Sequence, residues 1–268
     1  MMKKTCCMLM VIGVLLTSGC GKFGQYIEGV KNIMSGHEGQ QEEILKALEE
    51  KYGEEFEVMG IGGQWGSMNP NTVKAMCYPT KNKYLTFMVE MNVNTHIVYD
   101  KYLARSVAEN EKHEIKSVAE EIWGECQIET NIDTVMSYPK ETNLDMRFSE
   151  YTKLYPGNWL LVDIFIGSEK TPDIEVEVEK IQQCLKGLQE KKYTNVTFCV
   201  LYLKSEGYEE FETLQPESIP FYSYYIDEEE EQVYAYVRNK ILKDGTMKKG
   251  KEALIENFNY WLGEKKHE

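Results

Sequence analysis

Two nearly continuous apolar runs constrain the fold of this chain more than any other feature. Residues 159–166 read WLLVDIFI and residues 196–203 read VTFCVLYL. Runs of this kind, without polar alternation, are typical of strands that are buried on both faces of a sheet. A helical pattern separates them, so the β-α-β order permits a parallel pair of central strands. The apolar positions of that helix are Ile174, Val178, Ile181, Leu185 and Leu188.

The remaining pattern predicts shorter strands and amphipathic helices on both sides of this unit. Turn-rich gaps between the early strands favour an antiparallel meander. Gly53 is placed to end the first helix, and Thr171 is placed to cap the helix between the two apolar runs. The expected helices are Gln40–Tyr52, Ile97–Trp123, Met146–Leu154 and Lys248–Leu262, and the expected strands are Phe56–Trp65, Thr72–Tyr78, Tyr84–Met91, Gln127–Asp133 and Gln232–Ile241.

These elements predict an α+β fold, with a helix plus antiparallel meander module followed by a second mixed sheet with covering helices. A polar break near residues 138–143 suggests the division between them. We therefore expect one α+β module over residues 40–140 and a second over residues 141–268, with a shared core left open.

The N-terminus has the layout of a secretory signal over residues 1–19. Lys3 and Lys4 precede an apolar stretch from Met8 to Leu16, and small residues follow it. The apolar stretch is too short to cross about 30 Å of hydrocarbon, which needs about 20 helical residues. A transmembrane span is therefore not expected.

The sequence Leu16-Thr17-Ser18-Gly19-Cys20 resembles the lipobox of bacterial lipoproteins. The resemblance covers residues 1–20 and departs slightly at Thr17, where leucine is most common. It implies cleavage before Cys20, attachment of diacylglycerol to its thiol, acylation of the freed amine in many cases (for example by palmitate), and an extracytoplasmic protein anchored to the cell membrane. Residues 20–39 would then form a juxtamembrane linker or an amphipathic helix at the headgroups.

The charge of the chain limits its partners. The formal charge is −14, and removal of Lys3 and Lys4 with the signal would make it −16. No basic stripe is evident against this charge, so nucleic acid is not an expected partner. Attachment to a membrane is expected through the acyl chains and not through a polybasic patch.

Cysteines and histidines give no recognisable metal or catalytic pattern. Without the signal and Cys20, four cysteines remain. The sequence does not decide whether they are buried thiols or form disulfides. No HExxH or zinc-ligand spacing occurs. We therefore assign no catalytic residue, no metal and no cofactor. The residues concerned are Cys77, Cys126, Cys184, Cys199, His37, His96, His113 and His267.

Two further motifs have structural interpretations. GIGGQWG at residues 60–66 lacks the third glycine of a dinucleotide fingerprint, because Trp65 occupies that position, so a strand bulge or a close approach of the backbone is expected. Asp227–Glu231 lacks the glycine of a calcium loop and fits a solvated hairpin tip.

Tyrosines supply the candidate ligand site. If residues 221–226 and 232–241 pair in a hairpin, alternation places four tyrosines on one face. Such a face can stack on sugars or peptide side chains. The four residues are Tyr222, Tyr224, Tyr234 and Tyr236.

These features favour a non-enzymatic, lipid-anchored surface protein that binds an envelope glycan or a protein partner. The alternative is a cell-envelope enzyme with an unrecognised active site. A deep cleft that gathers histidines or buried carboxyl groups would favour the enzyme, and a shallow aromatic face would favour binding.

Overall fold

A computed structural model describes residues 36–62, 71–134, 142–211 and 230–264. The expected signal, Cys20, the juxtamembrane stretch up to residue 35, Tyr222 and Tyr224 lie outside the described residues. The chain divides into two compact units, one made of Met1–Lys81 and Met88–Tyr99 and the other of Asn82–Phe87 and Asp100–Glu268. Each is considered by itself.

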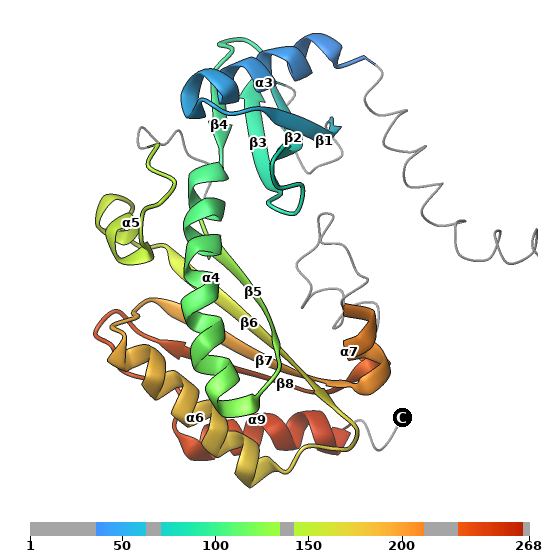
Figure 1. Cartoon of the computed structure of the whole chain (residues 1–268), viewed down its shortest axis with the longest axis vertical. Helices are drawn as coiled ribbons and strands as arrows, with labels where there is room; N and C mark the ends of the chain where they lie inside the picture. The colour runs from blue at the N-terminus through green and yellow to red at the C-terminus, as the bar shows by residue number, and fades with distance from the viewer. Residues whose placement is uncertain (1–35, 63–70, 135–141, 212–229, 265–268) are drawn as a thin grey trace, which may run out of the picture. The chain divides into compact units, whose positions relative to one another are not determined.

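The first sheet has four strands in sequential order with a helix beside it (Figure 1). Helix α3 buries Ile44 and Leu48 and ends at Gly53, which adopts a left-handed backbone with φ of 70°. This confirms the expected helix stop, because glycine takes that conformation without steric cost. The elements are α3 (Glu38–Tyr52), β1 (Phe56–Ile61), β2 (Thr72–Pro79), β3 (Phe87–Asn92) and β4 (Val98–Asp100).

Strand β1 contains the bulge expected near Gly60. Its antiparallel register with β2 shifts between Val58 and Gly60. Beyond the strand, the Gly62 N–H donates to the carbonyl oxygen of Lys74 at 2.9 Å. The glycine-rich stretch therefore continues the pairing of the sheet as far as it is described.

The second sheet is mixed, with the strand order β5-β6-β7-β8. Strands β6 and β7 are the two apolar runs and pair in parallel, while β5 and β8 flank them in antiparallel. The strands are β5 (Gln127–Asp133), β6 (Trp159–Ser168), β7 (Val196–Lys204) and β8 (Val233–Ile241). The predicted α+β fold, with a meander and a mixed sheet, is confirmed.

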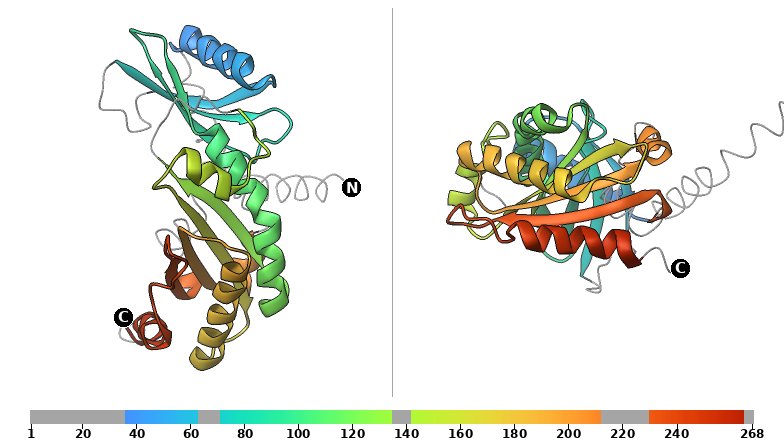
Figure 2. Two further views of the ribbon diagram at one scale, coloured as in Figure 1. Left: turned by 90° about the vertical axis from the view of Figure 1, so that its left-hand side faces the viewer. Right: turned by 90° about the horizontal axis from the view of Figure 1, so that it is seen from below.

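Helices α4, α6 and α9 contribute to one large core with one face of this sheet (Figures 1 and 2). Buried residues of the strands and helices, such as Val162, Val200, Val107 and Leu185, are fully inaccessible to solvent. The helices are α4 (Tyr102–Trp123), α5 (Phe148–Leu154), α6 (Ile174–Glu190), α7 (Ser205–Phe211) and α9 (Lys251–Glu264), with a short 3-10 turn η2 (Glu230–Gln232).

Three sequence expectations are corrected. The division expected near residue 140 lies near residue 100, because α4 and β5 pack into the second sheet's core. The helix expected from Ile97 begins at Tyr102, because Val98–Asp100 forms β4. Asp173, and not Thr171, caps α6, since its carboxylate accepts from the Val176 N–H at 3.1 Å.

Candidate functional site

The two faces of the mixed sheet differ in chemistry. Side chains alternate along a strand, so the residues between the core positions point to the opposite face. On that face one row runs across all four strands, as Cα partners in the register. This polar row consists of Glu129, Asp163, Cys199 and Arg238.

A second row lies one step along the strands. Its members are Asn131, Leu161, Thr197 and Lys240. Lys240 also places its Nζ 4.5 Å from the centre of the Trp159 ring, in a cation–π contact. We call the surface formed by both rows the polar face, and it carries acids on β5 and β6 and cations on β8.

Asp163 is the central charged group of the polar face. Asp163 is 8% exposed to solvent. Burial raises the pKa of its carboxyl to about 7, while a hydrogen bond with Cys199 lowers that pKa, Glu129 raises it and Arg238 lowers it. Near neutral pH the carboxyl is therefore present in both protonation states.

Cys199 lies beside Asp163 and accepts a hydrogen bond from the Tyr236 hydroxyl at 3.3 Å. Burial raises the pKa of the Cys199 thiol far above its ordinary value. The thiol therefore stays protonated at neutral pH, whereas a cysteine nucleophile needs the thiolate. Cys77, Cys126 and Cys184 are likewise buried thiols, which matches one of the two alternatives left open by the sequence.

The end of the polar face nearest α7 is apolar. Phe165, Leu201, Leu203 and Val233 form a small buried cluster, against which Tyr208 of α7 packs. A Cβ atom on Gly167 would come within 2.7 Å of the Tyr208 ring, so this glycine permits the helix to approach the sheet. The accessible part of the polar face is thus toward Trp159 and Lys240.

The predicted tyrosine face is only partly reproduced. Tyr236 packs against the small apolar cluster, whereas Tyr234 packs against the large helix-covered core. The register explains this, because Ala235 pairs with Tyr202 and Val233 pairs with Leu203, which makes Tyr234 an extra residue in a bulge. The expectation that Tyr234 and Tyr236 share a face is corrected, and Tyr236 is the one on the polar face.

Neither His96 nor His113 lies on a strand of the mixed sheet. His96 contacts the Glu43 carboxylate through Nδ1 at 2.7 Å, between the turn after β3 and α3. His113 is exposed on α4. Among the described residues, no group of three or more His, Cys, Asp or Glu side chains is placed to hold a metal ion. The described helices also include none that is long and apolar enough to span a membrane.

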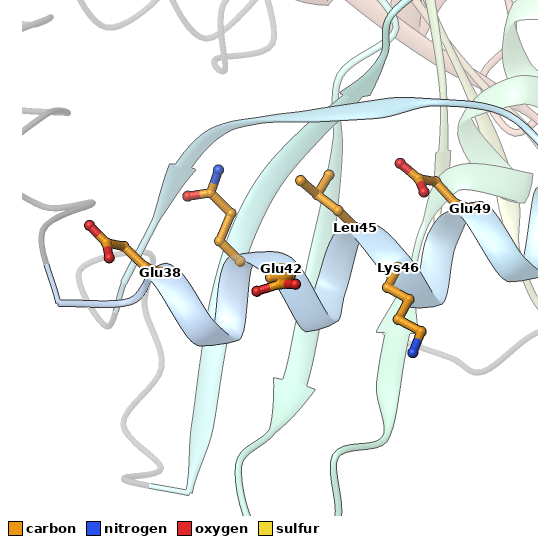
Figure 3. A pocket seen from close by; sticks show the side chains of 6 residues that line it. Glu38, Glu42, Leu45, Lys46 and Glu49 are labelled. Atoms are coloured by element: carbon orange, nitrogen blue, oxygen red, sulfur yellow. The ribbon is translucent and has the colours of Figure 1, made fainter.

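A shallow hollow lies along α3 (Figure 3). Its described lining comes from one helix face and is mostly charged, with Leu45 as the apolar member. A single helix face does not surround a ligand, so this hollow is a weaker candidate than the polar face. The lining residues are Glu38, Gln41, Glu42, Leu45, Lys46 and Glu49.

Asp163 had a visible signal in the sequence, as the one acid within WLLVDIFI, but no site was assigned to it. A charged residue inside an apolar strand conflicts with burial and therefore marks a position worth testing. Its neighbours Glu129, Cys199 and Arg238 carried no comparable signal, because only the strand register brings them together.

Comparison with known proteins gives a fold but no activity. No protein-family model and no curated protein matches the chain. Among solved structures, the fold is similar to the crystal structure of a DUF5037 family protein from Ruminococcus gnavus, with a TM-score of 0.57 and 16% sequence identity. The similarity covers 83% of this chain and 98% of the other, and at this identity it concerns the fold alone.

Proposed function

We propose that this protein is a lipid-anchored extracytoplasmic binding module that takes its ligand at the polar face. The anchor would be the acylated thiol of Cys20, and the membrane would be its first partner. The ligand would be a glycan, polymer or protein of the cell envelope. The lipobox resemblance supports the location, and the asymmetry of the mixed sheet supports the binding role.

The observation that carries the binding proposal is the position of Asp163. It lies on a central strand with 8% exposure, where an apolar side chain would stabilise the sheet more. Arg238, the cation of its row, lies two strands away in the register. Groups that cost stability in this way concentrate at functional sites.

The anchor is tested through Cys20. In the native host, processing of the precursor should be blocked by globomycin, and the mature protein should partition into detergent. The Cys20→Ala protein should leave the membrane fraction, because the signal stretch is too short to remain as a span. A Cys20→Ala protein that still fractionates entirely with membranes would rule out anchoring through this residue.

The binding role is tested by retention of envelope material on the immobilised full-length protein in mild detergent. Arg238→Ala should reduce retention several-fold, because Arg238 is an exposed member of the polar row. Lys186→Ala is the matched control, since its side chain is 74% exposed on α6. Equal retention by both variants, with unchanged melting temperatures, would remove the polar face from the proposal.

An envelope enzyme is the second candidate, and one observation favours it. A carboxyl with a pKa of about 7 suits general acid or base catalysis near neutral pH. Against it, the neighbouring Cys199 thiol stays protonated and so supplies no nucleophile. Binding therefore remains the preferred function.

A further inference from the structure

One segment of this acidic chain is strongly basic. Residues 238–251 contain six cationic side chains and one acid, Asp244, although the whole chain has a formal charge of −14. No helical or strand period aligns these cations, so they do not form a stripe that is visible in the sequence alone. The cations are Arg238, Lys240, Lys243, Lys248, Lys249 and Lys251.

The fold gathers four of these cations at the β8 edge of the mixed sheet. The Lys248 N–H donates to the carbonyl oxygen of Lys240 at 2.9 Å. This bond places the chain that follows the turn beside the end of β8. The Asn257 amide oxygen accepts from the Arg238 N–H and from Lys249 Nζ, both at 3.2 Å. We call Arg238, Lys240, Lys248 and Lys249 the basic edge.

A buried asparagine holds this arrangement in place. Asn239 is 2% exposed, and its side chain donates to the Lys249 carbonyl at 3.1 Å and accepts from the Lys249 N–H at 2.9 Å. Buried amides with both ends satisfied fix a single geometry. The backbone positions of Lys240 and Lys249 in the basic edge are therefore set by the fold.

The charge of the basic edge is only weakly compensated within the described part of the chain, by the interaction of Arg238 with the Asp163 carboxyl. None of its four cations forms an ion pair there, whereas Lys251 nearby pairs with Glu175 at 3.0 Å. Partial burial, Lys248 and Arg238 lower the pKa of Lys249, in that order. The amino end of α9, at Lys251, adds the positive end of a helix dipole. Such mutual repulsion costs stability in the absence of an anion.

We propose that the basic edge binds a flexible, phosphate-bearing polyanion of the cell envelope. This proposal rests on the proposed function, which places the basic edge outside the cell. It names the ligand class for the polar face, since Arg238 and Lys240 belong to both the polar face and the basic edge. Phosphate groups spaced along a chain match a row of cations, and each neutralised phosphate releases counterions.

The surrounding charge favours a flexible chain over a lipid surface. A planar anionic membrane would approach the acidic remainder of the protein as well as the basic edge, whereas a single polymer strand contacts the edge alone. A polymer without bases is favoured over nucleic acid, because binding of single strands uses stacking on open aromatic rings. The Trp159 ring beside the edge is already occupied by Lys240.

The test measures binding of long-chain inorganic polyphosphate to the full-length protein in a neutral detergent. Four phosphate contacts predict a slope of log K against log salt of about −3. Lys240→Gln/Lys248→Gln should weaken binding by about tenfold at low salt and reduce the magnitude of the slope by about 1.4. Both changes leave the backbone hydrogen bond between these residues intact.

Lys46→Gln/Lys186→Gln is the matched control, because both side chains are 74% exposed and pair only loosely with a glutamate one helical turn away. The control should bind as the wild type does. An equal loss in both double variants would mean diffuse attraction and would overturn the basic edge as a site. Displacement of polyphosphate by phosphatidylglycerol micelles at equal phosphate, or tighter binding of single-stranded DNA, would overturn the choice of ligand.

This outcome is separable from the proposed function. If polyphosphate fails to bind while retention of envelope material still depends on Arg238, the ligand class is wrong and the binding face stands. If polyphosphate binds as expected and the Cys20→Ala protein stays with the membrane, the anchor is wrong and the basic edge stands.

Discussion

Arg147 holds Glu111 with a bidentate pair of hydrogen bonds. Its Nε donates to one carboxylate oxygen at 2.9 Å and its Nη2 to the other at 2.7 Å. Glu111 lies on α4 and is 1% exposed, and its carboxylate also accepts from the Phe148 N–H at 2.7 Å. The pair therefore fastens the start of α5 to α4.

Removing the cation should destabilise the fold. Arg147→Met leaves a buried carboxylate without its counter-charge, so we expect a loss of about 2–4 kcal/mol in the free energy of unfolding by urea. Arg147→Lys keeps the positive charge but loses the bidentate hydrogen bonding of the guanidinium. Its free energy of unfolding should therefore lie between those of the wild type and Arg147→Met. The double variant Glu111→Gln/Arg147→Met should recover part of the loss, and a double variant as unstable as the sum of the single ones would contradict this account.

Glu114 predicts how stability changes in acid. Partial burial opposes its ionisation, but hydrogen bonds from Arg147, Lys191 and Tyr193 outweigh burial and hold its pKa at about 2, below the usual 4.5. A lowered carboxyl pKa adds stability that is present above the unfolded pKa and is lost as pH falls toward the folded pKa. The wild type should lose stability between about pH 4.5 and 2, and Glu114→Gln should lose less over that window. Parallel curves of unfolding free energy against pH would show that Glu114 contributes nothing.

For Asp163 we expect the opposite change of stability with pH. Burial raises its pKa from 3.8 to about 7, so the folded chain holds a proton that the unfolded chain releases. Stability from this group is full below about pH 4 and is lost as pH rises through about 7. The free energy of unfolding of Asp163→Asn should therefore exceed that of the wild type increasingly as pH rises, by about 2–4 kcal/mol at pH 8. A variant that is less stable than the wild type at pH 8 would mean that the carboxylate has a compensating partner.

The sequence predicted the centre of the fold better than its boundaries. The apolar runs at 159–166 and 196–203 became β6 and β7, because burial on both faces leaves a strong and local signal. The short β4 was missed, since three residues at the end of a turn carry no period. The boundary between the modules was expected near residue 140, but β5 pairs with β6 and so belongs to the second sheet. No local sequence pattern between the two strands indicates this pairing.

The candidate site was less predictable, because it depends on register. Glu129, Asp163 and Arg238 stand far apart in sequence. They fall in one row only through the register, in which Asp163 pairs with Glu129 and with Cys199, and Cys199 pairs with Arg238. The bulge at Tyr234 moves one tyrosine to the other face, and one-residue irregularities of this kind defeat any count by alternation. The lone acid in an apolar run was the one local sign of the polar face.

Gly187 offers a test of packing between α4 and α6. A Cβ atom at this position would lie 2.9 Å from Cγ1 of Val118, so the two helices approach closely there. Alanine improves helix propensity by about 1 kcal/mol, but the contact must open or Val118 must move. We expect the packing cost to win, with Gly187→Ala less stable by about 1–2 kcal/mol in urea unfolding. Gly263 in α9 is the control, since a Cβ there meets nothing within 4 Å, and Gly263→Ala should be neutral or slightly stabilising. If both variants gain stability alike, the approach of α4 to α6 at this point is looser than the contact indicates.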